Sequence, residues 1–295
     1  MLGSWIAKAA PLACRWAVVI FGLALTAPAA SAAPLNAQDT QIAQRWAANN
    51  AMFVLYHEMA HLLVDQLNLP VLGREEDAAD NMATHILLSQ RTNEADQALV
   101  DAARGWLLTD AAGPETFQTS DFYDSHSLNL QRAYAIVCMM VGSDRNAFGR
   151  IADVYGIDPF RQDSCAGDFN LIDRSVDRVM AAYGAPDTRD GGVKVHYEVA
   201  TGLMSRAAVA FKRSGVFEKV ADTLDKDYRL RRSVVLRAQL CDQPNAFYDP
   251  NHDEIIFCYE LMHEFLDMAR QDMAYIRVNA PETSKKVNKK ARHSP

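Results

Sequence analysis

The chain has 295 residues, 49 % of them hydrophobic, so it is long enough to bury a large core and is not a disordered or fibrous composition. It carries 30 basic and 37 acidic residues. This negative balance argues against nucleic acid as a partner.

The first forty residues differ in composition from the rest. Lys8 and Arg15 precede an apolar run from Trp16 to Leu25, and an A-S-A site follows at residues 30–32. This is the pattern of a secretory signal peptide. A membrane anchor is the alternative, but the run is short for crossing a bilayer. We predict a signal peptide over 1–32, no stable membrane insertion after its cleavage, and a periplasmic or secreted protein.

The stretch from Gln41 to Leu67 is predicted to be helical, as one helix or two abutting helices, and ends at Asn68-Leu69-Pro70. It contains H-E-x-x-H as His57, Glu58 and His61. On a helix the two imidazoles lie one turn apart on the same face and can share a metal ion. Glu58 then faces the open position of the metal as general base for a water molecule. This is the arrangement of zinc hydrolases.

A second helix is predicted over residues 74–88, after a turn at Gly73. Glu76 and Asp80 lie one turn apart on it. An acidic helix start is by itself a common solvated feature that suits the helix dipole, but this one follows H-E-x-x-H after a short turn. Glu76 is predicted as the third metal ligand, and Asp80 as the acceptor for the far nitrogen of a liganding His. Glu75 remains an alternative ligand, although it lacks the one-turn spacing to Asp80.

These two motifs resemble those of the gluzincin class of zinc peptidases, whose second motif is a helical E-x-x-x-D or E-x-x-A-N. Over most of its mature length the chain also resembles a family of exported bacterial proteins known only as metallopeptidases, in blocks at residues 73–80, 126–132, 245–250 and 258–261. The resemblance implies a zincin-like fold and a zinc site, and it supplies no substrate. The gap between the motifs, fourteen residues from His61 to Glu76, is shorter than in better-known gluzincins.

A helix around residues 98–108 and a loop at Gly113-Pro114 are predicted before a segment that offers Tyr123 and His126. This segment leads into an apolar helix over 133–141. A His or Tyr outside the metal shell can hydrogen-bond the oxyanion formed in peptide hydrolysis, so His126 and Tyr123 are candidates for that role. The simpler interpretation is an N-capping Asp124 or Ser125 beside a surface histidine.

Fewer chemical groups stand out in the second half. The patterns predict a helix end and turn over 151–161, a helix over 168–183, a loop over 187–192, a strand over 193–199 with His196 on its solvent face, and mostly helix over 203–237. Residues 246–248 and 254–259 are predicted to form a β-hairpin. The hairpin either binds a peptide by strand addition or is only structural.

The last predicted helix starts at Tyr259 and contains His263-Glu264, which partly repeats the first motif, although Asp267 replaces the second His. Glu260 and His263 are therefore considered as neighbours of the active site. Residues 280–295 are predicted to be a basic, disordered tail.

Four cysteines remain once the signal peptide is removed: Cys138, Cys165, Cys241 and Cys258. An even number without a C-x-x-C pair, in an exported protein, indicates two disulfides rather than metal ligands. Three pairings are open. The local one is the simplest, because Cys241 and Cys258 flank the predicted hairpin.

These patterns predict an α+β protein, predominantly α-helical, with one zincin-like domain over 33–279 and a small hairpin or sheet. The expected activity is hydrolysis of a peptide or protein substrate, with Zn²⁺ held by His57, His61 and Glu76. A non-catalytic binding protein that keeps the zincin fold is an alternative, against which the intact Glu58 argues. A zinc hydrolase acting on a non-peptide acyl substrate is another, because the same site serves any acyl group. Oligomeric state and cleavage specificity stay open.

Overall fold

A computed structural model describes residues 36–114, 116–183 and 191–279 of the chain. The predicted signal peptide over 1–32 and the predicted tail over 280–295 lie outside the described residues. So does most of the loop predicted over 187–192.

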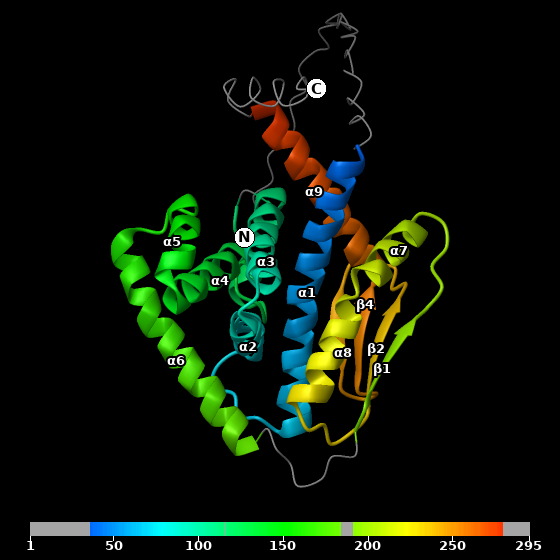
Figure 1. The fold of residues 1–295 in the computed structure, drawn as a ribbon, viewed down its shortest axis with the longest axis horizontal. Helices are drawn as coiled ribbons and strands as arrows, with labels where there is room; N and C mark the ends of the chain where they lie inside the picture. Colours follow the sequence, from blue (N-terminus) through cyan, green and yellow to red (C-terminus); the bar gives the residue numbers. More distant parts are fainter. Residues whose placement is uncertain (1–35, 115, 184–190, 280–295) are drawn as a thin grey trace, which may run out of the picture. The chain divides into compact units, whose positions relative to one another are not determined.

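The described residues are predominantly helical and contain a four-stranded sheet, which confirms the α+β prediction (Figure 1). The α-helices are α1 (Ala37–Leu67), α2 (Glu75–Gln90), α3 (Asn93–Ala112), α4 (Asn129–Ser143), α5 (Arg145–Val154), α6 (Pro159–Tyr183), α7 (Met204–Ser214), α8 (Val216–Asp227) and α9 (Tyr259–Asn279). A short 3₁₀ helix covers Thr119–Phe122. The strands are β1 (Val193–Tyr197), β2 (Val234–Gln239), β3 (Ala246–Asp249) and β4 (Glu254–Cys258). None of the described helices is long and apolar enough to cross a membrane.

Helix α1 lies at the centre of this arrangement. From Ala43 onward most of its residues are buried on every side, as expected for a helix that is apolar all round. It packs against α2, α3, α7, α8 and α9, and also against β3 and β4. Its end is sharp because Asn68 takes a left-handed conformation, with φ of 53°, and donates its N–H to the carbonyl groups of Val64 and Asp65. The H-E-x-x-H residues are therefore held on a helix that the core immobilises.

The sheet has the order β1-β2-β4-β3. Strand β2 pairs in parallel with β1 and β4, and β3 pairs antiparallel with β4 as the predicted hairpin. Helix α8 contacts β1, and α1 contacts β3 and β4, so the two helices lie side by side against the sheet. Strand β3 is an edge strand, and it lies next to the metal-motif helix.

The prediction of mostly helix over 203–237 is wrong at its end. Helix α8 stops at Asp227, and residues 234–239 form the central strand β2. Burial alternates along the strand with a period of two residues: Val234, Leu236 and Ala238 are buried, and the residues between them are less so. The charged residues around the strand obscure this alternation in the sequence. Arg237 is accommodated on the sheet by ion pairs with Glu198 and Glu254.

Helix α6 also begins earlier than predicted, at Pro159 rather than at Asp168. A proline suits the first turn of a helix, because the N–H that it lacks would have no partner there. Pro159 therefore begins a helix where a turn is predicted from the sequence. Helix α4 likewise starts at Asn129, before the predicted residue 133.

Two disulfides have the local pairing. Cys138 of α4 is bonded to Cys165 of α6, and Cys241 is bonded to Cys258 at the end of β4. Helices α4 and α6 approach closely beside the first bond, because a Cβ at Gly142 would lie 2.3 Å from the carbonyl oxygen of Cys165. These bonds remove the four cysteines from any metal site.

Candidate metal centre

A cleft of about 660 Å³ brings together four segments that are distant in sequence. Its walls come from α1, from the start of α2, from the loop before α4, and from β3 with the residues beside it. The polar and aromatic groups that line it include His57, Glu58, His61, Glu75, Glu76, His126, Asn245, Phe247 and Tyr248.

Three side chains converge on one point of this cleft. The Oε2 atom of Glu76 lies 3.1 Å from Nε2 of His57 and 3.3 Å from Nε2 of His61. The two Nε2 atoms are 3.1 Å apart. Each of the three residues can offer one ligand atom to a common metal ion. The one-turn spacing of the histidines on α1 and the adjacent helix α2 together produce this set.

Carboxylates behind the histidines determine which nitrogens face the centre. Nδ1 of His57 is 2.8 Å from Asp80 Oδ1, and Nδ1 of His61 is 2.7 Å from Glu75 Oε1. Since an ionised carboxylate only accepts hydrogen bonds, both Nδ1 atoms carry the hydrogen. In the neutral form that binds a metal, the two rings would direct their Nε2 lone pairs at each other and at Glu76. A cation among them removes this repulsion, and two imidazoles with one carboxylate suit a divalent transition metal, so the residues fit a metal ion.

The carboxylates of the cluster favour positive charge among them. Burial alone would lower the pKa of His57, but hydrogen bonds to Asp80 and Glu76 outweigh burial and raise that pKa to about 9. Burial also opposes protonation of His61, and Glu76 and Glu75 again raise its pKa. Hydrogen bonds from His126, His57 and His61 hold the pKa of Glu76 far below its usual range. The site therefore keeps Glu76 ionised, and its carboxylates stabilise positive charge, which protons on the imidazoles supply when no metal is bound.

Arg132 of α4 forms an ion pair with the carboxylate of Asp80. Its guanidinium donates two hydrogen bonds of 2.7 Å to the Asp80 carboxylate and lies 3.7 Å from the centre of the Trp106 ring. Burial would raise the pKa of Asp80, but the hydrogen bonds from His57 and Arg132 outweigh it and lower that pKa. Sequence reasoning gave Arg132 no role beyond its place in a family block.

Glu58 is buried, with 8 % of its surface exposed, and lines the same cleft. Its Oε2 atom accepts the backbone N–H of Tyr248, on β3, at 3.0 Å. Burial raises the pKa of the Glu58 carboxyl, while the nearby His57 and His61 oppose that rise. The contact of Glu58 with the edge strand had no signal in the sequence, because it joins residues from opposite ends of the chain.

His126 is brought to the cluster by its loop. Its Nε2 lies 2.9 Å from Glu76 Oε2, and its ring is stacked with that of His57 at 6.2 Å between centres. Arg74 donates to the carbonyl oxygen of His126, and Asp124 accepts the backbone N–H of His126 at 2.8 Å. The pKa of His126 is raised, chiefly by its hydrogen bond to Glu76.

Four other residues considered from the sequence are not among those lining this cleft. The side chain of Tyr123 is 77 % exposed. Glu260 accepts the backbone N–H groups of Cys241 and Asp242, and His263 pairs with Asp267 on its own helix. His196 is exposed on β1 and pairs with Glu198, as its predicted solvent position implies.

A family model described as "Putative metallopeptidase" matches residues 24–180 and 198–293. The chain belongs to this family. Membership supports a metal-dependent peptidase with a peptide or protein substrate, and it confirms the resemblance noted in the sequence. Every residue of the cluster around Glu76 lies inside the matched ranges. No curated protein and no solved structure matches the chain.

Proposed function

We propose that the chain is an exported zinc metallopeptidase of the gluzincin type, with Zn²⁺ held by His57, His61 and Glu76. The convergence of these three side chains on one point, with their far nitrogens held by carboxylates, carries the proposal. When bound, Zn²⁺ supplies a Lewis acid that polarises the scissile carbonyl and acidifies water. A zincin-like arrangement, a metal-motif helix beside an edge strand, is part of the same proposal.

Glu58 acts as the general base. It takes a proton from the attacking water and passes it to the leaving amine. Burial raises the pKa of its carboxyl, which brings it nearer to the range that suits proton transfer in both directions. The N–H of Tyr248 holds Oε2 and thereby fixes the direction of the other carboxylate oxygen.

His126 donates a hydrogen bond to the oxyanion that develops on the carbonyl. It faces the cleft next to Glu76, and Asp124 and Arg74 hold its backbone. For this role its Nε2 exchanges Glu76 Oε2 for the oxyanion, whose developing negative charge the hydrogen bond stabilises. The exposed position of Tyr123 gives no support to the same role for that residue.

The edge strand β3 is proposed to receive the substrate as an added strand. It lines the cleft and has β4 on one side only. An extended peptide can pair with such an edge through main-chain hydrogen bonds. We also propose that residues 1–32 are a signal peptide; the two disulfides support export, because such bonds persist in oxidising compartments.

A metal analysis combined with activity profiling tests the proposal. The purified protein is expected to contain one zinc in the cleft and to cleave members of a peptide library, with loss of activity in a chelator. Glu58→Gln should keep that zinc and lower kcat by about 100- to 10,000-fold. Glu264→Gln, which changes an exposed acid of α9 outside the cleft and outside a second cavity beside α1, is the matched control.

Three results would overturn parts of this proposal. Turnover that survives in Glu58→Gln contradicts the assigned base. A protein that binds no metal in the cleft points to a binding protein, and cleavage of cell-wall amides or esters in place of peptides contradicts the substrate class.

A further inference from the structure

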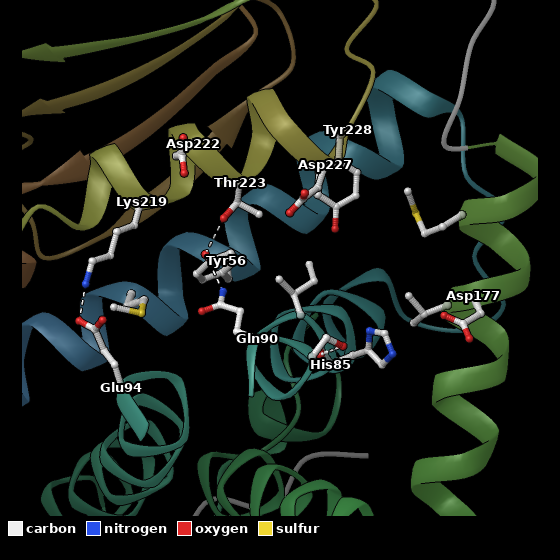
Figure 2. Close-up of a pocket in the computed structure, with 15 residues that line it drawn as sticks. Tyr56, His85, Gln90, Glu94, Asp177, Lys219, Asp222, Thr223, Asp227 and Tyr228 are labelled. Carbon is white, nitrogen blue, oxygen red and sulfur yellow. Dashed lines mark hydrogen bonds and ion pairs between the residues drawn. The ribbon is translucent and has the colours of Figure 1, made fainter. Parts of the chain in front are cut away.

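A second cavity, of about 720 Å³, lies on a different face of α1 from the cleft and shares no lining residue with it. Figure 2 shows this cavity, with walls from α1, α2, α6 and α8. Tyr56 reaches into it and hydrogen-bonds Thr223 and Gln90. Tyr56 immediately precedes His57 on α1, so two consecutive residues line the second cavity and the cleft, respectively.

At one end of the cavity, His85 and Asp177 of its lining lie close to Asp173, and these three side chains could hold a metal ion. His85 of α2 lies with Nε2 2.9 Å from Oδ1 of Asp173, on α6. Asp177 stands one turn after Asp173 on α6, and Figure 2 shows it facing His85 across the end of the cavity. One ligand atom from each residue lies within 4.8 Å of the other two.

The charge of the cavity favours a cation there. Its lining holds four acidic residues, Glu94, Asp177, Asp222 and Asp227, against one lysine, Lys219, while Asp222 is also paired with Lys226 from outside the lining. The Lys219 ammonium is already paired with Glu94 at the far end of the view in Figure 2. A concave surface lined by one sign of charge raises the local concentration of the opposite ion.

The burial of His85 also argues for a ligand role. Only 8 % of this residue is exposed, so its imidazole is held at the cavity wall rather than in bulk water. Two carboxylates one turn apart on the same helix repel each other. A divalent cation between them and the imidazole relieves that repulsion.

We propose that His85, Asp173 and Asp177 form a second divalent-cation site, separate from the cleft. One imidazole nitrogen and two carboxylate oxygens suit a first-row ion such as Zn²⁺ or Mn²⁺. Water in the cavity completes the coordination. The ion ties α6 to α2, the helix that carries Glu76 and Asp80. This proposal does not depend on the proposed function.

Metal stoichiometry of the full chain tests the site. Metal-free protein is dialysed to equilibrium against Zn²⁺, and in parallel against Mn²⁺, and bound metal is counted. The wild type should bind two equivalents of Zn²⁺. Asp177→Asn and His85→Asn should each bind one, with affinity for the second reduced at least tenfold, while His57→Ala should lose the other equivalent. Asp222→Asn, an acid of the same cavity outside the ligand set, should keep both.

A thermal shift provides a second readout. In His57→Ala, added Zn²⁺ should raise Tm through the remaining site, and the rise should disappear when Asp177→Asn is combined with it. The proposal is overturned if the wild type binds one equivalent that only His57→Ala removes, or if His85→Asn and Asp177→Asn still bind two. An equal loss in Asp222→Asn also overturns it, since that result means diffuse attraction to acidic side chains. A wild type that binds Zn²⁺ only at His85, Asp173 and Asp177, and not at His57, would contradict the proposed function and leave this proposal standing.

Discussion

Asp80 holds the ring of His57, which we propose as a metal ligand. Its carboxylate holds Nδ1 of His57 at 2.8 Å and is itself held by both arms of the Arg132 guanidinium. We therefore expect Asp80→Asn to lower Zn²⁺ affinity in the cleft by about 10- to 100-fold, because the ring loses its fixed tautomer and orientation. Competition with a chromophoric chelator measures this affinity. Asp163→Asn, at an exposed acid of α6, is the control, and an unchanged affinity in Asp80→Asn would contradict the role of this contact.

Whether the role of a residue could be predicted depended on the separation in sequence between that residue and its partner. His57, Glu58 and His61 could be predicted as neighbours because they lie within about one helical turn of each other. Glu76 and Asp80 followed because the next helix is joined by a short turn. Arg132 and Tyr248 had no local pattern, since their partners lie 52 and 190 positions away. Nothing in the sequence indicates which arginine faces Asp80.

The bond between Cys241 and Cys258 stabilises the strand that supports the edge of the cleft. It joins the end of β4 to the segment before β3, over a separation of 17 residues. A bridge over a loop of that length is expected to contribute about 3 kcal/mol, mainly by restricting the unfolded chain. Replacing both cysteines by serine should therefore lower the free energy of unfolding by about that amount, measured by urea denaturation. An unchanged midpoint and slope would show that the hairpin is held by its packing alone.

Helices and strands were predictable where the spacing of apolar residues agreed with the turn residues at their ends. The helix that carries the metal motif had an uninterrupted apolar repeat and a turn after it, and the hairpin had a turn rich in Asp, Pro and Asn between two apolar runs. The segment that forms strand β2 was wrongly predicted to be helical, because charged residues at helical spacing precede it and Arg237 lies within it. The pairing partners that make it a central strand, β1 and β4, come from other parts of the chain.

At the scale of the whole molecule, ion pairs join distant parts of the chain and make its stability depend on pH. Arg232 bonds Asp65 of α1 and Asp253 before β4, and Arg237 bonds Glu254. Burial would raise the pKa of Asp253, but Arg232 outweighs it and lowers that pKa, and Arg237 lowers the pKa of Glu254.

The unfolded chain therefore takes up protons at these carboxyls before the folded chain does. Their stabilising contribution is complete above the unfolded pKa values, about 4, and is lost as the pH falls through the lower folded values. We expect the urea midpoint to fall between pH 5 and pH 3, and expect Arg232→Met to show a smaller fall because its midpoint is already reduced at pH 5. An equal fall in both proteins would show that Arg232 does not contribute.

The hydrogen bond from Tyr248 to Glu58 spans 190 positions of the chain. A contact so distant in sequence forms late, since a large loop must close before it brings any gain. A chain that emerges from the ribosome with its N-terminus first has both histidines and Glu76 long before it has β3. During synthesis, then, the three proposed metal ligands precede the strand that holds the proposed base. If these assignments are correct, the parts that bind the ion are made well before the part that orients Glu58.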